Sequence, residues 1–224
     1  MQIYQCIQLG TSNSYLIASR SGLVLVDAGN KNYIKKFEHS LHEFHISPDQ
    51  VKLIIITHVH FDHVGSLNDI KELCGCEVAV HRSEASLLRT GTSTLPPGTN
   101  PLARGISWLG NNLLPNSATE FDEVEPEILV DEEIDLLEFG VNGRIVHTPG
   151  HTSGSISLLL DSGEAFVGDL AVNYLPFDIS IFPPFAEDTT QLIASWRKIQ
   201  RMGARIILPA HGRPFSADKF KKYF

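Results

Sequence analysis

The sequence predicts a mixed α/β fold in which two β-sheets face each other and helices cover their outer faces. Short apolar runs, typical of strands, are followed by segments whose apolar residues recur at helical spacing. The strand-like runs form two groups, one before residue 82 and one after residue 127. Because each sheet needs cover on both faces, two facing sheets with helices outside would bury both groups.

The first group comprises four expected strands and two expected helices: strands at 13–18, 23–27, 53–57 and 77–81, and helices at 33–44 and 67–73. The run at 53–57 is continuous and largely β-branched, which is typical of a strand buried on both faces. Asp27-Ala28-Gly29 ends the strand before the first helix, and Gly75 follows the second helix.

The second group is preceded by a loop and an expected amphipathic helix, whose apolar residues are Leu102, Ile106, Leu109 and Leu113. Strands are then expected at 128–130, 134–137, 144–147, 155–160, 165–167 and 205–208, with helices at 189–202 and 216–224. Asp188 is the expected N-cap of the helix at 189–202, and Gly203 follows its end.

Length and composition limit the class of protein. The chain of 224 residues indicates one domain, 1–224, and 42% hydrophobic with 20% charged residues is typical of a globular protein. No apolar run is long enough to cross a bilayer, and the first residues do not resemble a secretion signal. Three cysteines cannot all pair, so we expect a reduced, cytoplasmic compartment.

The net charge of −8 is concentrated in one stretch. Ten acidic residues and no Lys or Arg lie between Glu120 and Glu138. We interpret this stretch as a solvated loop and sheet edge, with an anion-repelling rim as the alternative. The chain contains no basic block that would neutralise a phosphate backbone, so a nucleic-acid partner is not expected.

The decisive motif is Thr57-His58-Val59-His60-Phe61-Asp62-His63, directly after the predicted buried strand. The pattern H-x-H-x-D-H would arise by chance in about one chain in a thousand of this composition. Imidazole nitrogens and carboxylate oxygens are usual ligands of Zn²⁺ and similar ions. One metal ion would leave part of this cluster unused, whereas two ions about 3.5–4 Å apart would use all of it.

Three further candidate ligands follow apolar runs: His151 in His147-Thr148-Pro149-Gly150-His151, Asp169 in Phe166-Val167-Gly168-Asp169, and His211 in Leu208-Pro209-Ala210-His211. Each alone is a weak signal. Together with the first motif, and in this order, they would complete two coordination spheres.

These motifs resemble the metallo-β-lactamase-fold superfamily, and within it the glyoxalase II-like and lactonase-like dinuclear hydrolases. The resemblance extends over most of the chain and implies a four-layered α/β/β/α sandwich. It implies that His58, His60 and His151 hold a first metal ion, that Asp62, His63 and His211 hold a second, and that Asp169 bridges the two. Its implied cofactors are two divalent ions, Zn²⁺ first, with Fe or Mn as alternatives.

The resemblance predicts a metal-dependent hydrolase in which a hydroxide bridging two metal ions cleaves an ester, thioester or lactone of a small molecule. Asp62, Asp169 and Tyr174 are the candidate catalytic residues, with Tyr174 as a donor to the oxyanion or leaving group. Asp27, Thr57 and Thr152 are candidates for orienting the imidazoles. The alternative on the same scaffold is a mononuclear iron persulfide dioxygenase, which would need only His58, His151 and Asp169.

The 88 positions from His63 to His151 are expected to contain an inserted cover segment near 86–119. Its two basic residues, Arg89 and Arg104, and its apolar helix would suit a small acyl compound with one negative charge. The loop at 177–185 is a second candidate apolar wall. The expected partner is a small-molecule substrate, with no membrane or nucleic acid, and a homodimer is left open.

Overall fold

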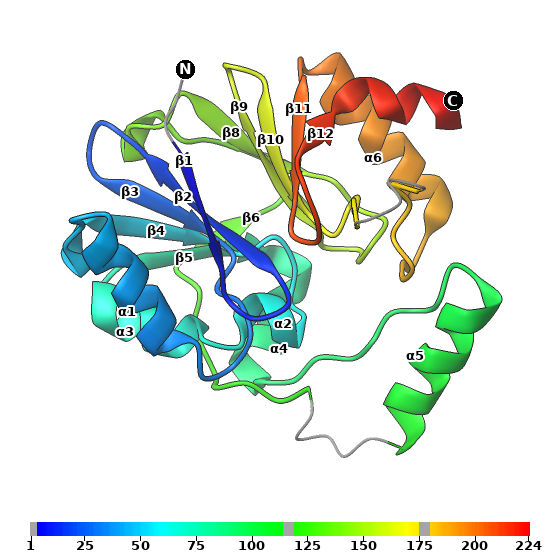
Figure 1. The fold of residues 1–224 in the computed structure, drawn as a ribbon, viewed down its shortest axis with the longest axis horizontal. Helices are drawn as coiled ribbons and strands as arrows, with labels where there is room; N and C mark the ends of the chain where they lie inside the picture. The colour runs from blue at the N-terminus through cyan, green and yellow to red at the C-terminus, as the bar shows by residue number, and fades with distance from the viewer. Residues whose placement is uncertain (1–3, 114–118, 175–179) are drawn as a thin grey trace.

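The computed structural model describes residues 4–113, 119–174 and 180–224. It is a four-layered α/β/β/α sandwich with two mixed sheets, as the sequence predicts (Figure 1). Each sheet has six strands among the described residues. Helices lie outside both sheets, and none in the described part of the chain is long and apolar enough to cross a membrane.

The first sheet has the order β1-β2-β3-β4-β5-β6. Its strands are β1 (Tyr4–Gln8), β2 (Asn13–Ala18), β3 (Leu23–Val26), β4 (Val51–Ile55), β5 (Glu77–His81) and β6 (Ile128–Val130). The strands from β3 to β6 are mutually parallel, whereas β1, β2 and β3 pair antiparallel. The carboxyl ends of β3 and β4 therefore meet at one edge of the sheet.

The second sheet has the order β12-β11-β10-β9-β8-β7. Its strands are β7 (Glu133–Asp135), β8 (Gly143–His147), β9 (Ile156–Leu160), β10 (Glu164–Gly168), β11 (Ile206–Pro209) and β12 (Phe215–Ser216). Only the β10–β11 pair is parallel, which brings the carboxyl ends of these two strands together.

The helices connect and cover the strands. They are α1 (Ile34–Glu43), α2 (Phe61–Val64), α3 (Leu67–Cys74), α4 (Ala85–Thr90), α5 (Pro101–Leu113) and α6 (Thr189–Arg201). Helices α1 and α3 cover the first sheet, and α6 covers the second together with the 3-10 segment Ala217–Tyr223. The predicted N-cap is confirmed, since the carboxylate of Asp188 accepts hydrogen bonds from the backbone N–H groups of Thr190 and Gln191.

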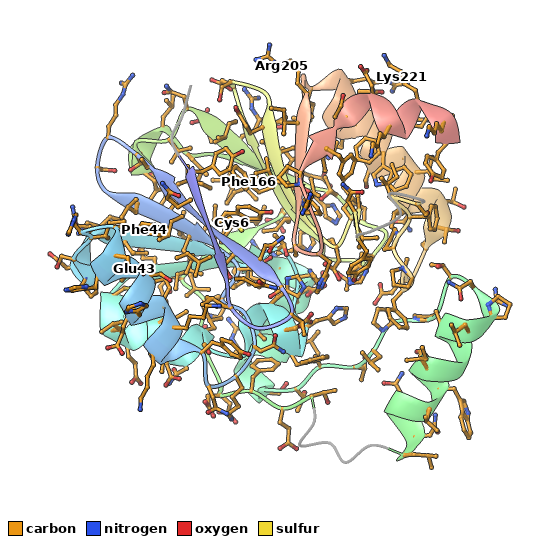
Figure 2. The ribbon with its side chains drawn as sticks, viewed as in Figure 1. Cys6, Glu43, Phe44, Phe166, Arg205 and Lys221 are labelled. Atoms are coloured by element: carbon orange, nitrogen blue, oxygen red, sulfur yellow. The ribbon has the colours of Figure 1, made fainter. Side chains whose placement is uncertain are left out.

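Three apolar layers hold this arrangement together, one between the sheets and one under the helices on each side. Successive side chains of a strand point to opposite faces, so a strand contributes to two layers. In β4, Leu53 and Ile55 lie between the sheets, whereas Ile54 packs under the helices. In β10, Phe166 points into the layer between the sheets and contacts the ring of Tyr15 (Figure 2). Burial on both faces explains why most residues of these strands are apolar.

The acidic stretch at 120–138 is a charged surface segment in which basic residues of other elements pair with six of the ten acids. Its ion pairs are Lys31–Asp122, Lys71–Glu127, Arg82–Asp131, Arg89–Glu125, Arg144–Glu133 and Lys198–Glu132. These contacts are exposed or nearly so, so each contributes little to stability. The interpretation as a solvated loop and sheet edge therefore agrees with the structure.

Candidate metal centre

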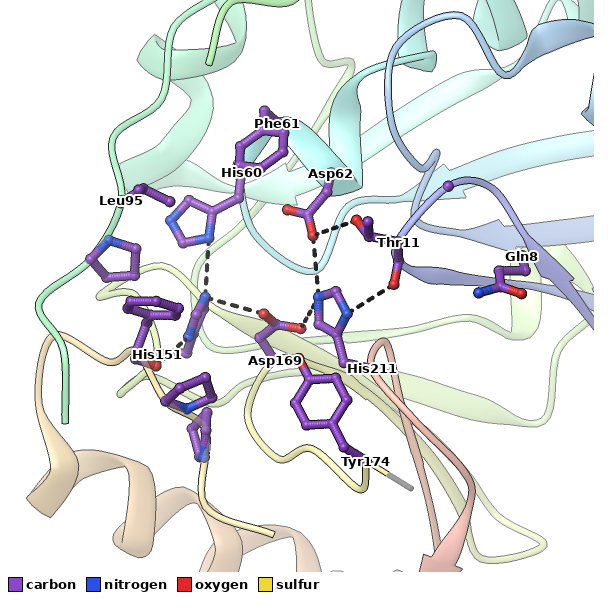
Figure 3. Close-up of a pocket in the computed structure, with 15 residues that line it drawn as sticks. Gln8, Thr11, His60, Phe61, Asp62, Leu95, His151, Asp169, Tyr174 and His211 are labelled. Carbon is purple, nitrogen blue, oxygen red and sulfur yellow. Dashed lines mark hydrogen bonds and ion pairs between the residues drawn. The ribbon is translucent and has the colours of Figure 1, made fainter. Parts of the chain in front are cut away.

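The predicted ligands lie in the loops, and in the short helix α2, that follow the carboxyl ends of strands. His58 and His60 follow β4, and Asp62 and His63 lie in α2 directly after them. In the second sheet, the loops after β8, β10 and β11 carry one ligand each, namely His151, Asp169 and His211. Because the two sheets face each other with these ends on the same side, the side chains meet in one cluster. Figure 3 shows five of them, from His60, Asp62, His151, Asp169 and His211.

One part of the cluster consists of three buried imidazoles, from His58, His60 and His151. One nitrogen of each ring lies within 4.8 Å of the others. Nε2 of His151 is 3.1 Å from Nδ1 of His60, and the ring of His58 lies 4.5 Å from each of the two other rings, between centroids. This geometry can hold one metal ion with three nitrogen ligands.

The second part combines two imidazoles with a carboxylate. Nε2 of His211 lies 3.2 Å from Oδ2 of Asp62, and Nε2 of His63 lies 3.9 Å from Oδ1 of the same residue. The three ligand atoms are again within 4.8 Å of one another. His63 is fully buried, and the side chains of Asp62 and His211 are mostly buried, so a cation here would meet two nitrogen ligands and one oxygen ligand.

Asp169 lies between the two parts. Its Oδ2 is 3.7 Å from Nε2 of His151, in the first part. Its Oδ1 is 3.5 Å from Nε2 of His63 and 3.4 Å from Nε2 of His211, both in the second part. The two oxygens of one carboxylate thus face two different groups of ligands.

Three buried atoms of the cluster have no hydrogen-bond partner: Nε2 of His58, Nε2 of His63 and Oδ1 of Asp169. A buried polar atom without a partner costs about 1–3 kcal/mol, so such atoms are rare unless they have a function. All three point into the cluster and are of the types that bind Zn²⁺ and related ions. The residues present therefore fit a metal centre.

The hydrogen bonds on the far side of the rings fix which nitrogen faces the cluster. Nδ1 of His151 lies 2.9 Å from the carbonyl oxygen of Phe185, and Nδ1 of His211 lies 3.0 Å from that of Thr11. Because a carbonyl oxygen only accepts, both Nδ1 atoms must carry the hydrogen. Each Nε2 then offers its lone pair to the cluster, as a metal ligand requires.

Asp27 and Thr57 orient the neighbouring rings of His63 and His58. Oδ2 of Asp27 lies 2.9 Å from Nδ1 of His63. The hydroxyl of Thr57 donates to the Asp27 carboxylate, so its oxygen is free to accept from Nδ1 of His58 at 3.1 Å. The backbone of Asp27 adopts a positive φ of 59°, a conformation uncommon outside glycine, which places this carboxylate under the site.

Thr152 does not contact an imidazole and instead donates a hydrogen bond to Glu84. Glu84 is buried and also accepts a hydrogen bond of 2.5 Å from the backbone N–H of Val59. One carboxylate thus ties the loop that carries His58 and His60 to the loop that carries His151. Burial raises the pKa of Glu84, although these hydrogen bonds act to lower it.

Sequence reasoning missed Glu84 because it stands alone, 24 positions after His60, in a segment with no motif. An acidic residue beside the apolar pattern of α4 is the only signal, and that signal is common at helix starts. Sequence reasoning also missed Gln8 and Thr11, which belong to the β1–β2 hairpin and border the site.

A glycine permits the close approach of two of these loops. Gly168 has a φ of 53°, and a Cβ built on it would lie 2.3 Å from Oγ1 of Thr57. Any side chain here would displace either Thr57 or the neighbouring ligand Asp169. The glycine before Asp169 is therefore part of the site's construction.

The electrostatics of the first part keep its imidazoles neutral. Burial lowers the pKa of His58 well below its ordinary value, and the neighbouring rings of His63 and His60 lower it further. Burial and the ring of His151 lower the pKa of His60 to about 3. The pKa of His151 is lowered by burial as well, against the opposing effect of Asp169. A neutral imidazole is the form that binds a metal ion.

The second part behaves in the opposite way. Burial alone would lower the pKa of His63, but the carboxylates around it, Asp27 foremost, raise it well above its ordinary value. Asp169 and Asp62 likewise raise the pKa of His211 against the effect of burial. The pKa values of Asp62 and Asp169 are in turn held low by His63 and His211, although burial raises them. This part attracts positive charge, which protons supply when no metal ion does.

A cavity of about 560 Å³ opens above the cluster (Figure 3). His60, Asp62, His151, Asp169 and His211 form its floor. Its walls are mostly apolar and include Phe61, Leu95, Pro96, Tyr174, Pro183, Pro184 and Phe185, with Gln8, Gly10 and Thr11 at the side of the β1–β2 hairpin. A volume of this size is typical of small-molecule sites.

The segments predicted to border the site do so only in part. Leu95 and Pro96 line the cavity, but α5 does not, and residues 114–118 of the predicted cover lie outside the described part of the chain. The two segments that form the wall are joined, since the N–H of Thr99 donates to the carbonyl of Pro184 at 2.8 Å. Residues 177–179 of the second predicted wall are also outside the described ranges, and Phe182 packs against Trp196 in the outer core.

Neither basic residue of the predicted cover segment lines the cavity. Arg89 forms an ion pair with Glu125, and Nε of Arg104 donates to the carbonyl oxygen of Gly98. Among the described residues, no Lys or Arg lines the cavity. Tyr174, the predicted proton donor, lies beside the cluster. Its ring is 6.0 Å from that of His211, between centroids.

Comparison with known proteins identifies relatives of this chain. The chain is 28% identical to a probable metallo-hydrolase, YflN, of Bacillus subtilis, over 94% of this chain and 84% of that protein. It is 26% identical to a beta-lactamase-like protein 2 homolog of Drosophila melanogaster, over 90% of this chain and 58% of the longer relative.

Solved structures share the fold. The BLEG-1 B3 metallo-beta-lactamase superposes with a TM-score of 0.71 at 22% identity, covering 98% of this chain and 97% of that one. TTHA1623, crystallised in a di-iron-bound form, superposes with a TM-score of 0.67 at 23% identity, covering 96% and 95%. The family model of the metallo-beta-lactamase superfamily matches residues 7–211, so the chain belongs to that superfamily.

Proposed function

We propose that this protein is a hydrolase that holds two divalent metal ions and cleaves an ester, thioester or lactone bond of a small molecule. His58, His60 and His151 would hold one ion, and Asp62, His63 and His211 would hold the other. Asp169 would bridge them. The observation that carries the proposal is the position of Asp169, whose two oxygens face the two sets of ligands.

Two divalent cations at these sites would supply a hydroxide at neutral pH and would polarise the carbonyl group of the substrate. Zn²⁺ fits the nitrogen-rich ligand set. Iron is the alternative, since a neighbour of the same fold was crystallised with two iron ions and imidazole ligands suit both metals.

The residues of the chain itself would position the substrate and move a proton. The apolar walls formed by Phe61, Leu95 and Phe185 suit an uncharged acyl group above the cluster. Tyr174 would donate its phenolic proton to a leaving alkoxide, whereas a thiolate would leave as an anion. Burial raises the pKa of Tyr174, helped by the charges of Asp169 and Asp62, so the phenol keeps its proton at neutral pH.

The loop at 183–186 would serve both the substrate and the metal ligands. Its side chains form one wall of the cavity, and the carbonyl of Phe185 accepts the hydrogen bond from Nδ1 of His151. A displacement of this wall would therefore also tilt a ligand, which couples the shape of the cavity to the geometry of the cluster.

A panel of uncharged aryl esters, alkyl thioesters and lactones tests the proposal. Protein stripped with a chelator should lose turnover, and addition of Zn²⁺ or Fe²⁺ at two equivalents per chain should restore it. No metal-dependent turnover with any member of the panel would contradict the hydrolase. Oxygen uptake with a persulfide, at one iron per chain, would assign the alternative function of a persulfide dioxygenase.

A further inference from the structure

Helix α5 is built with its apolar face turned outward. Its residues Leu102, Ile106, Leu109 and Leu113, which we call the α5 stripe, are between 48% and 76% exposed, and the neighbouring Trp108 is 61% exposed. In Figure 1 this helix stands at the periphery of the molecule, away from both sheets. Five of the large hydrophobic residues that are exposed in the described chain thus belong to one helix of 13 residues.

The polar face of α5 is the side that packs against the protein. Oγ of Ser107 donates to the carbonyl of Pro96 at 2.8 Å. The side chain of Asn111 accepts from the N–H of Leu95 at 3.0 Å and donates to its carbonyl at 2.9 Å. A Cβ at Gly110 would lie 2.4 Å from a methyl carbon of Leu95, so this side is in close contact. These contacts fix the rotation of the helix and keep the stripe outward.

The spacing of the stripe fits a partner that is itself a helix. Its four residues follow one another at intervals of four, three and four positions. This pattern gives a narrow apolar seam, which is typical of helices that pack against each other side by side, rather than the broad face that covers a sheet. With 13 residues, α5 offers about 20 Å of seam.

The charged residues of α5 indicate which kind of partner its seam can bind. Between Pro101 and Leu113 the only charged residue is Arg104, whose side chain bonds to Gly98. A helix that lies on a membrane surface ordinarily carries several basic residues on its polar face, and this chain has a net charge of −8. A second α5 carries no charge on its own seam, so two copies can meet there without repulsion.

The exposed area is sufficient for such a contact. The four side chains of the stripe, with on the order of 120 Å² exposed each, make a patch of about 480 Å², in the upper range for a monomer. Two such patches bury about 1,000 Å² together, which is the lower limit for a specific interface. We propose that α5 packs against α5 of a second copy of this chain, so that the protein is a two-fold symmetric dimer.

The dimer would brace the wall of the cavity. Leu95 and Pro96, which α5 holds through Ser107 and Asn111, are the same residues that line the cavity above the cluster. An interface that fixes α5 therefore also fixes this wall. The assembly proposed here does not depend on the proposed hydrolase activity, and its test measures mass rather than turnover.

Sedimentation equilibrium of the metal-loaded full chain between about 1 and 100 µM tests the interface. Wild-type protein should have twice the chain mass of 24.8 kDa at the upper concentrations. Leu109→Glu should be a monomer throughout, because a charge cannot be buried in the seam. Leu137→Glu is the matched control, since Leu137 is 63% exposed but lies far from α5 in the sequence, in a 3-10 turn. It should remain a dimer.

A second measurement tests the interface even if Leu109→Glu fails to fold. In a Cys6→Ser background, which removes the exposed cysteine, Ile106→Cys or Leu109→Cys should be linked into dimers by a short bis-maleimide. A wild-type monomer at 100 µM, a dimeric Leu109→Glu, or no linkage through either cysteine would overturn the proposal. Binding of monomers to phosphatidylcholine vesicles would overturn it as well, and would assign the stripe to lipid.

Discussion

The carboxylate of Asp27 lies 2.9 Å from Nδ1 of His63, although the two residues are 36 positions apart and follow different strands. The same carboxylate accepts hydrogen bonds from the backbone N–H and the hydroxyl of Thr57, which in turn contacts His58. A single buried acid thus orients one imidazole from each of the two proposed metal sites.

Replacement of Asp27 by Asn should weaken metal binding. The amide carries no charge and fixes the ring of His63 less firmly, so we expect affinity to fall about 10–100-fold. Competition with a chromophoric chelator measures this change. Asp188→Asn is the matched control, because Asp188 caps α6 far from the cluster and Asn caps helices equally well. Equal affinities for the wild type and Asp27→Asn would contradict the proposed role of Asp27.

Replacement of Glu84 by Gln should destabilise the protein. Glu84 accepts from both Val59 and Thr152, and an amide can offer only one of its two polar atoms as an acceptor. A buried donor would then lose its partner, at a cost of about 1–3 kcal/mol in the free energy of unfolding.

Urea unfolding of the metal-free protein measures this free energy. Glu187→Gln provides the comparison, since Glu187 accepts from the N–H of Ser153 in the same loop but its hydrogen bond is exposed. We expect Glu187→Gln to have a much smaller effect. If the two variants unfold at the same urea concentration, Glu84 does not hold the two ligand loops together.

Replacement of Tyr174 by Phe should reduce kcat only where the leaving group needs a proton. We expect kcat to fall about 100-fold for alkyl esters, and to change little for nitrophenyl esters, whose leaving group departs as an anion. Tyr223→Phe is the control, because Tyr223 packs against Trp196 in the outer core. An equal loss with both types of ester would show that the ring supports the wall and donates no proton.

The stability of the metal-free protein should depend on pH in a characteristic way. The raised pKa values of His63 and His211 stabilise the fold below about pH 6.5, and this stabilisation is lost as the pH rises through their folded-state values. The lowered values of His58, His60 and His151 act in the opposite sense, since the unfolded chain takes up protons at these residues below pH 6.5. The metal-free protein should therefore be most stable near pH 6.5.

Bound metal ions should remove the loss of stability on the alkaline side, because they replace the protons on His63 and His211. Thermal unfolding between pH 5.5 and 9, with and without chelator, measures both curves. A melting temperature of the metal-free protein that rises steadily from pH 6.5 to 9 would contradict the electrostatics derived for the second part of the cluster.

The sequence predicts those parts of the fold that are buried on both faces. Apart from Lys52 and Ser157, the runs that form β4 and β9 are apolar, and such runs have few other interpretations. Sequence analysis did not predict strand β1. Only one of its five residues, Ile7, is fully buried, so its apolar pattern is too weak to indicate a strand. Its position at the edge of a sheet is a property of the tertiary structure.

The metal ligands and the residues around them also differ in how far the sequence predicts them. Four of the seven predicted ligands lie within six positions, so local spacing reveals them. The ties between ligand loops come from residues such as Glu84, which only the folded chain brings near. Periodicity likewise predicts that α5 is amphipathic, but which of its faces meets the protein depends on Leu95 and Pro96, outside the helix.

The metal content of protein purified without added metal tests the central claim most directly. We predict two divalent ions per chain in the wild type, and about one in His211→Ala, since only the second set of ligands loses a member. Wild-type protein that binds a single ion per chain even when metal is in excess, or a His211→Ala variant that retains two, would contradict the account of two metal sites joined by Asp169.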